Sequence, residues 1–306
     1  MKGFSVKNGF GIGAVIFAVA ALISLPLRTA QFFNIIEFGG SGFYTYIDWS
    51  VYALGIVIAA AIIAFLVLGI LKRKKLDYDR EIKSNPVFGI FSLVAAAGAF
   101  VDGISCAMKF SNNFDPIIIR DYNGVPTWNT DKLIHGGEAV FAVFSAIFFL
   151  ALGLSALRNK TNGSEHKLIS LAPVLWCIIR MIFRFSRTIS YLKVSDLAFE
   201  LLMLAFLVMF FMAFAQVNSQ IGAKNFEWKL AGYGLPAALL ALICFVPRLI
   251  VTLSGESVLL YEHSPVEICD LTNSLFIIAT VFTKLTDRVQ KEETPEENKE
   301  EVSAKE

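Results

Sequence analysis

Residues 168–191 read LISLAPVLWCIIRMIFRFSRTISY. The stretch is apolar enough and long enough to cross a bilayer as a helix, yet it contains three arginines. Arg180, Arg184 and Arg187 follow the spacing i, i+4, i+7 and therefore share one helical face. Because an arginine at the bilayer centre costs roughly 2.5–3.5 kcal/mol on insertion scales, these side chains need partners or water. The stretch predicts a polar site inside a membrane protein.

Two carboxylates open the next apolar stretch, residues 195–215, which read SDLAFELLMLAFLVMFFMAFA. Asp196 and Glu200 are four residues apart and share a helical face. Ion pairs between these acids and the arginines before them would hold the two helices together. A guanidinium group also matches a carboxylate or phosphate group bidentately, so the same arginines are candidates for binding an anion. Both interpretations follow from the sequence.

Apolar segments of membrane-spanning length recur along almost the whole chain of 306 residues, of which 56% are hydrophobic. The mean hydropathy of +0.62 is too high for an ordinary soluble domain. We therefore predict an all-α, polytopic integral membrane bundle with about eight transmembrane helices. The predicted spans are residues 9–27, 49–71, 87–108, 134–157, 168–190, 196–217, 230–253 and 266–285.

The distribution of lysine and arginine predicts the orientation of these spans. If the N-terminus is cytoplasmic, the inner segments contain sixteen of these residues and the outer segments five. Both termini are therefore expected to be cytoplasmic. The first span lacks a small-residue cleavage site and is expected to be retained rather than removed as a signal peptide. We expect a multi-pass protein of the cell (cytoplasmic) membrane, in a bacterium because no eukaryotic sorting signal is present.

The chain divides into two parts by composition. Residues 1–285 form the predicted transmembrane domain, whereas residues 286–306 are rich in acids and are expected to be a disordered cytoplasmic tail. Membrane lipids are the expected surroundings, and a net charge of +1 gives no reason to expect a nucleic-acid partner. The four cysteines fall within predicted spans without a CxxC pair, which is typical of apolar fillers.

Further charged residues fall in the outer halves of the predicted helices, whereas the inner halves contain none between the helix ends. The charged residues in the outer halves are Asp102, Glu138, Arg248, Glu267 and Asp270. Pro247 directly precedes Arg248 and is expected to kink the helix beside that charge. The asymmetry predicts a charged cavity that faces outward above an apolar inner plug. A continuous ion pore would need polar lining at both levels and is disfavoured.

The candidate ligand-binding residues are the charged groups that these patterns place together. They are Arg180, Arg184, Arg187, Asp196, Glu200, Arg248, Glu267 and Asp270. His135 and Glu138, taken with His263 and Glu267, also resemble a metal-ligand set, but polar residues at helix ends near the interface are the favoured interpretation. We therefore expect neither a metal nor another cofactor, and the sequence assigns no catalytic residue.

Three functions fit this site. The favoured one is a transporter, or a solute-binding membrane component, for a small solute whose anionic group is bound by Arg180, Arg184 and Arg248. The second is an intramembrane enzyme that acts on a lipid-linked or phosphorylated substrate at the outer leaflet, with Glu138 or Glu267 as general base. The third is a non-catalytic assembly or regulatory subunit in which the ion pairs only fix the bundle.

Overall fold

The computed structural model describes residues 6–37, 42–72, 85–112, 117–120, 126–158, 168–185, 195–219, 227–260 and 266–282. Within these ranges the chain forms eight α-helices and one short two-stranded hairpin. Arg187, His263 and the acidic tail at residues 286–306 lie outside the described residues. The all-α polytopic bundle predicted from the sequence is confirmed.

Six of the eight helices are long and apolar enough to cross a membrane. They are α1 (Val6–Asn34), α2 (Trp49–Lys72), α3 (Pro86–Asn112), α4 (Thr130–Leu157), α6 (Ser195–Asn218) and α7 (Glu227–Leu253). The other two are shorter: α5 (Ala172–Phe185) has 14 residues, and the helix Ile268–Phe282 is called here the C-terminal helix. Two of the eight predicted spans are therefore shorter in the described structure than the sequence indicated. α7 continues as one helix through Pro236 and Pro247.

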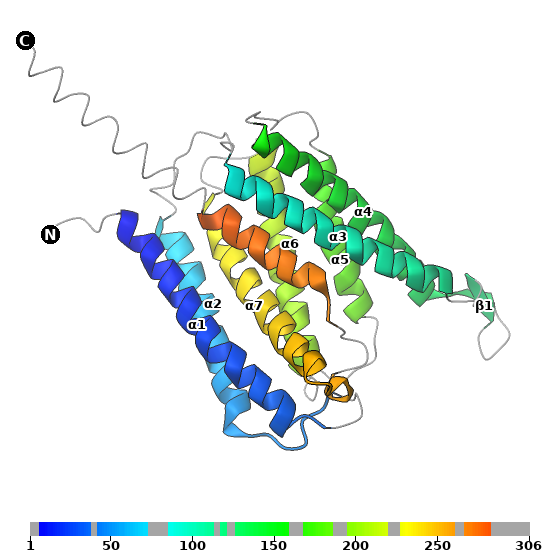
Figure 1. Cartoon of the computed structure of the whole chain (residues 1–306), viewed down its shortest axis with the longest axis horizontal. Helices are drawn as coiled ribbons and strands as arrows, with labels where there is room; N and C mark the ends of the chain where they lie inside the picture. Colours follow the sequence, from blue (N-terminus) through cyan, green and yellow to red (C-terminus); the bar gives the residue numbers. More distant parts are fainter. Residues whose placement is uncertain are drawn as a thin grey trace, which may run out of the picture.

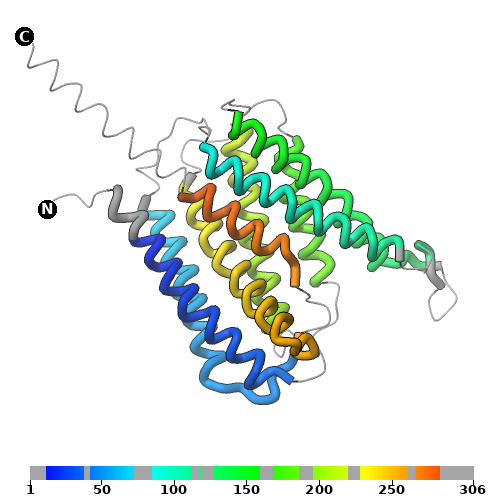
Figure 2. The backbone as a smooth tube through the Cα atoms, in the orientation of Figure 1, coloured from blue at the N-terminus to red at the C-terminus, as the bar shows by residue number. Residues whose placement is uncertain are grey.

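The helices run side by side, with α1 and α2 on one flank of the bundle and α3 and α4 on the other (Figure 1). α7 lies between the flanks and packs against α1, α2 and α6, while α5 packs against α4 and α6. The coloured part of α1 starts, and the C-terminal helix ends, at the same end of the bundle (Figure 2), which agrees with an even number of crossings. That this end faces the cytoplasm is still the prediction from the lysine and arginine count.

A short hairpin connects α3 to α4 beyond the far end of the bundle (Figure 1). Its strands β1 (Ile118–Arg120) and β2 (Pro126–Trp128) are antiparallel, with Ile118 opposite Trp128. α4 starts directly after β2, where the side chain of Asn129 accepts a hydrogen bond of 3.2 Å from the backbone N–H of Lys132. This cap satisfies one of the free donors at the start of the helix.

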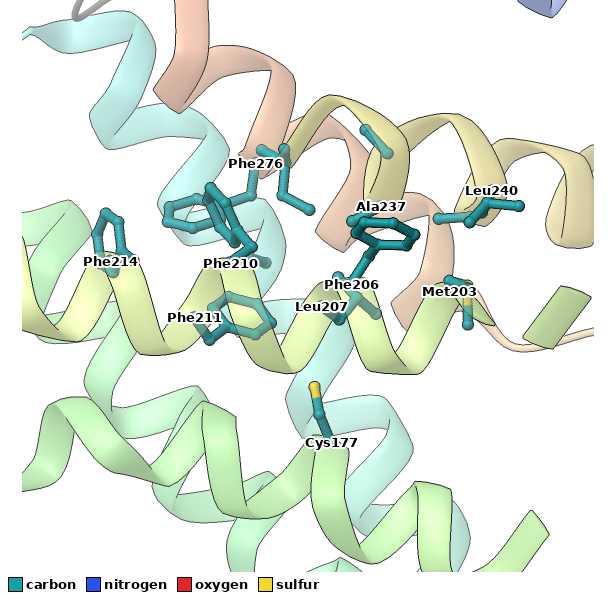
Figure 3. Close-up of a cluster of buried hydrophobic side chains, with 14 of the residues drawn as sticks. Cys177, Met203, Phe206, Leu207, Phe210, Phe211, Phe214, Ala237, Leu240 and Phe276 are labelled. Carbon is teal, nitrogen blue, oxygen red and sulfur yellow. The ribbon is translucent and has the colours of Figure 1, made fainter. Parts of the chain in front are cut away.

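Phenylalanine side chains fill the centre of the bundle. α6 is apolar on nearly all sides beyond its first two turns, as expected for a helix surrounded by protein. Its residues Phe210, Phe211 and Phe214 meet Phe276 of the C-terminal helix, whose ring centroid lies 5.0 Å from that of Phe149 in α4 (Figure 3). The cluster lies toward the second half of α6, away from the charged residues in its first two turns. An apolar cluster therefore lies apart from the charged residues, as the sequence predicts, and its position on the cytoplasmic side stays a prediction.

Small residues allow the C-terminal helix to approach its neighbours closely. A Cβ atom added to Gly98 of α3 would lie 2.8 Å from Cβ and 2.9 Å from Cγ2 of Thr272. On the opposite side, Ser274 donates a 3.0 Å hydrogen bond to the backbone carbonyl of Ala238 in α7. Close packing of small residues is the usual source of helix association in membranes, where lipid is as apolar as the side chains.

Candidate functional site

A continuous series of alternating positive and negative side chains crosses the bundle at the end opposite the start of α1. We call this series the ion-pair chain. Its members come from α1, α4, α5, α6, α7 and the segment that opens the C-terminal helix. In the order in which they are connected, they are Arg28, Asp196, Arg248, Glu200, Arg184, Glu267 and Arg180, and Arg180 also pairs with both Asp270 and Glu138. All are buried except Glu267, whose side chain is 13% exposed.

The chain begins at Arg28 near the end of α1. One terminal nitrogen of Arg28 forms an ion pair with Asp196 of α6, and the other donates hydrogen bonds to Gln31 (2.7 Å) and to the Tyr44 hydroxyl (3.0 Å). Gln31 in turn donates to the backbone carbonyl of Ser50 at the start of α2. These contacts tie α1 and α2 to α6, and the guanidinium carbon of Arg28 also lies 5.5 Å from the ring centre of Phe199 in α6.

Glu200 connects the middle of the chain. Its Oε1 accepts a 2.7 Å hydrogen bond from Nε of Arg184 in α5, and its Oε2 accepts one of 3.4 Å from Nη2 of Arg248 in α7. Nε of Arg248 also lies 3.9 Å from Asp196, so this arginine links the two acids of α6. Arg184 continues the chain through a 2.6 Å hydrogen bond from its Nη2 to Glu267.

Arg180 ends the chain among several carboxylates. Its Nη2 pairs with Glu267 and donates a 2.9 Å hydrogen bond to Asp270, while its Nε lies 3.8 Å from Oε1 of Glu138 in α4. Its guanidinium carbon is 5.5 Å from the ring centre of Trp176, one turn earlier in α5. The indole of Trp176 donates a 2.9 Å hydrogen bond to Asp102 of α3. A single arginine thus pairs with carboxylates from two other segments of the bundle, and Trp176 beside it reaches a third.

Several buried polar atoms at this end have no hydrogen-bond partner in the part of the chain that the structure describes. They include Nη1 of Arg180, Oδ2 of Asp270 and both polar atoms of the Asn273 amide. Asn273 is fully buried and lies three residues after Asp270, on the same broad face of the C-terminal helix. Buried polar groups in folded proteins are nearly always hydrogen-bonded, and each exception calls for an explanation.

The half of the bundle nearer the start of α1 has a different polar content. Its buried hydroxyls donate to the backbone carbonyl four residues earlier in the same helix, as Ser92 does to Phe88, Ser145 to Phe141 and Thr280 to Phe276. These bonds satisfy the hydroxyls within their own helices. The concentration of charge at one end, expected from the sequence, is therefore present among the described residues.

Seven of the eight sequence-predicted site residues belong to the ion-pair chain, and Arg187 lies outside the described residues. The pairing differs in detail from the expectation that the arginines of α5 meet the acids of α6. Arg184 pairs with Glu200, but Asp196 pairs with Arg28 and Arg248. Arg180 instead pairs with Glu267 and Asp270 at the opening of the C-terminal helix.

Arg28 is the member of the chain that the sequence analysis missed. The first span was predicted to end at residue 27, so Arg28 was counted in the outer loop. In the structure α1 continues to Asn34, and Arg28 is only 1% exposed. Its basic side chain was visible in the sequence, but its acidic partner lies 168 residues away along the chain. The sequence analysis includes Glu138 among the charges in the outer halves of the helices, but not among the candidate ligand-binding residues.

Comparison with family models, with curated proteins and with solved structures gives no match for this chain.

Proposed function

We propose that the protein is a membrane transporter, or the solute-binding component of one, whose ion-pair chain receives a small polar solute. The protein is a membrane-spanning helical bundle with buried charged residues, which is the setting that such a function needs. Ionisable residues inside a membrane are costly, and they commonly mark pathways for solutes or ions.

The observation that carries the proposal is the set of unpartnered polar atoms around Arg180. An ion-pair network that serves packing alone gains most when each of its donors and acceptors is satisfied, because an unsatisfied buried group costs roughly 1–3 kcal/mol. Here Arg180 offers a donor at Nη1, Asp270 offers an acceptor at Oδ2, and Asn273 offers both, with no partner among the described residues. These groups form a donor and acceptor set suited to a polar guest.

The charges indicate the class of solute. The ion-pair chain and Asp102 together contain six carboxylates and four arginines, so a solute that is only anionic would add to an existing excess of negative charge. A solute that carries an ammonium group as well would be compensated. The anionic group is assigned to Nη1 of Arg180, and the ammonium group to Asp270 and Asn273. A small zwitterion of the amino-acid type fits this description.

Binding and uptake by the purified full-length protein in liposomes test the proposal. The probes are radiolabelled glycine, alanine, serine and glutamate, with phosphate and lactate as anions that lack an ammonium group. We expect uptake or a rise in melting temperature with at least one zwitterion, and a smaller effect with phosphate and lactate. An absence of both effects with every probe would overturn the proposal.

A non-catalytic assembly subunit is the second candidate, and it is favoured by a different observation. Each of the four arginines in the ion-pair chain already has at least one carboxylate partner. An assembly role requires only that these pairs hold the helices in place. In that case Asn273→Leu, which breaks no ion pair, would leave the function of the assembled complex intact, whereas a solute-binding role predicts its loss.

A further inference from the structure

Three side chains of different ligand type meet where α3 and α4 pack, next to the ion-pair chain. Cys106 comes from α3, and His135 and Glu138 come from α4. One ligand atom from each residue lies within 4.8 Å of the other two. Cys106 and Glu138 are buried, and the side chain of His135 is 12% exposed.

The local sequence explains why these side chains converge. His135 and Glu138 are three residues apart in α4 and therefore point to the same face. Gly103 lets α3 approach that face, because a Cβ atom at this position would lie 3.2 Å from Val143 and 3.5 Å from the backbone carbonyl of Ala139. Cys106 follows Gly103 by three residues and is thereby directed at α4.

We propose that Cys106, His135 and Glu138 bind a divalent transition-metal ion of the Zn²⁺ type. A thiolate, an imidazole and a carboxylate are the ligands that such ions prefer. Bond lengths of 2.0–2.3 Å place neighbouring ligand atoms of a tetrahedral site about 3.3–3.8 Å apart. Nδ1 of His135 lies 3.9 Å from Oε2 of Glu138, so side-chain movements of a few tenths of an ångström bring these two atoms to the separation of neighbouring metal ligands.

The charge balance favours a divalent ion over other occupants. When the ion binds, the Cys106 thiol releases its proton, and the thiolate and the Glu138 carboxylate together neutralise the charge of +2. A neutral site carries the smallest desolvation cost at membrane depth. The second oxygen of Glu138 faces Nε of Arg180 at 3.8 Å, so a charged neighbour orients this ligand, as is usual around metal sites.

A second cluster of the same size, Glu267, Cys269 and Asp270, does not carry the same inference. Both of its carboxylates already bind guanidinium groups, from Arg180 and Arg184. A metal ion would have to displace at least one of these arginines and leave its charge buried. The proposed site differs from the metal-ligand set that the sequence suggests, which is His135, Glu138, His263 and Glu267. Cys106 takes the place of Glu267, and His263 lies outside the described residues.

The test is a titration of the purified full-length protein with Co²⁺, a spectroscopic probe for zinc-type sites, after treatment with a chelator. We expect one equivalent of Co²⁺ to bind and to give a thiolate-to-cobalt charge-transfer band, and Zn²⁺ to displace it. Cys106→Ser should remove the band. His135→Asn should retain the cysteine but weaken binding at least about tenfold.

The other buried cysteines supply matched controls, since each has a thiol in the same bundle. Cys177→Ser and Cys244→Ser should leave the cobalt band and its affinity unchanged. An absence of cobalt binding by the unmodified protein would overturn the proposal, as would a band that survives in Cys106→Ser. A band that is lost only in Cys269→Ser would also overturn it, because the metal would then occupy the second cluster. None of these readouts depends on solute transport.

Discussion

Arg28 of α1 and Asp196 of α6 form a buried ion pair although 168 residues separate them in the sequence. The pair joins the flank formed by α1 and α2 to the centre of the bundle. Arg28 also lies beneath the ring of Phe32, with its guanidinium carbon 4.7 Å from the ring centre. The two ends of the ion-pair chain are therefore anchored on opposite sides of the protein, one by Arg28 in α1 and the other by Glu138 in α4.

The first prediction concerns the coupling between these two residues. Arg28→Leu and Asp196→Leu should each lower the free energy of unfolding by about 3 kcal/mol, because each removes the nearest ion-pair partner of a buried charge. The double variant should be more stable than the sum of the single effects indicates, with a coupling of about 0.5–3 kcal/mol. Unfolding in mixed detergent micelles measures all three. Additive effects would show that the pair does not operate as a unit.

The second prediction concerns the geometry of Arg184, which donates from two different nitrogens to Glu200 and Glu267. Lysine keeps the charge but has a single ammonium group that cannot span both carboxylates in the same way. Arg184→Lys should therefore destabilise the protein by about 1–3 kcal/mol in the same unfolding assay. Arg158→Lys is the matched control, because Arg158 is exposed at the end of α4. Equal stability of the two variants would contradict this account.

The third prediction concerns the close approach of α3 to the C-terminal helix. In Gly98→Ala the new methyl group would overlap Thr272, whose hydroxyl donates to the backbone carbonyl of Cys269, so the helices must separate. We expect a loss of about 1–3 kcal/mol in the free energy of unfolding. Gly55→Ala in α2 is the control, since a Cβ atom there meets nothing within 4 Å, and it should be neutral or stabilising by up to about 1 kcal/mol. A stable Gly98→Ala variant would rule out the tight contact.

The fourth prediction separates solute binding from packing. Asn273→Leu replaces an unpartnered buried amide with an apolar group of similar size, so the melting temperature of the protein without solute should stay the same or rise. Uptake of a zwitterionic solute should fall at least about tenfold, which corresponds to the loss of one or two hydrogen bonds. Ser274→Ala is the neighbouring control for uptake, because Ser274 donates to Ala238 and not to the proposed site. Normal uptake by Asn273→Leu would remove Asn273 from the site.

Much of the fold follows from local properties of the sequence. Hydropathy over some 20 residues identifies a spanning helix, and six long apolar helices are present where the sequence placed them. The two helices that are shorter in the described residues are those that carry charges, namely α5 with Arg180 and Arg184 and the C-terminal helix with Asp270. A hydropathy window averages over such residues and does not show which of them lie inside a helix.

The partners within the site depend on contacts that no local pattern encodes. Arg180 and Asp196 both belong to the predicted site, yet Arg180 pairs with Glu267 and Asp270 at the opening of the C-terminal helix, and Asp196 pairs with Arg28 of α1. The sequence analysis places Arg28 outside the membrane because no local pattern shows its partner. The ion pair with the distant residue Asp196 offsets the cost of burying the Arg28 charge. Helix packing, rather than helix prediction, decides which acid meets which base.

The order of the charged residues along the chain has a consequence for the way the protein is made. Helix α5 carries Arg180 and Arg184, and both side chains are buried in the bundle. Their shared partner Glu267 is translated more than 80 residues after them. While the ribosome is still producing α6 and α7, Glu138 is the only carboxylate partner described for Arg180 that has been made, and Glu267 and Asp270 are still missing. The charged end of the bundle is therefore completed only when the C-terminal helix is made, and a nascent chain released before Glu267 would present an incompletely paired arginine to the quality-control machinery of the membrane.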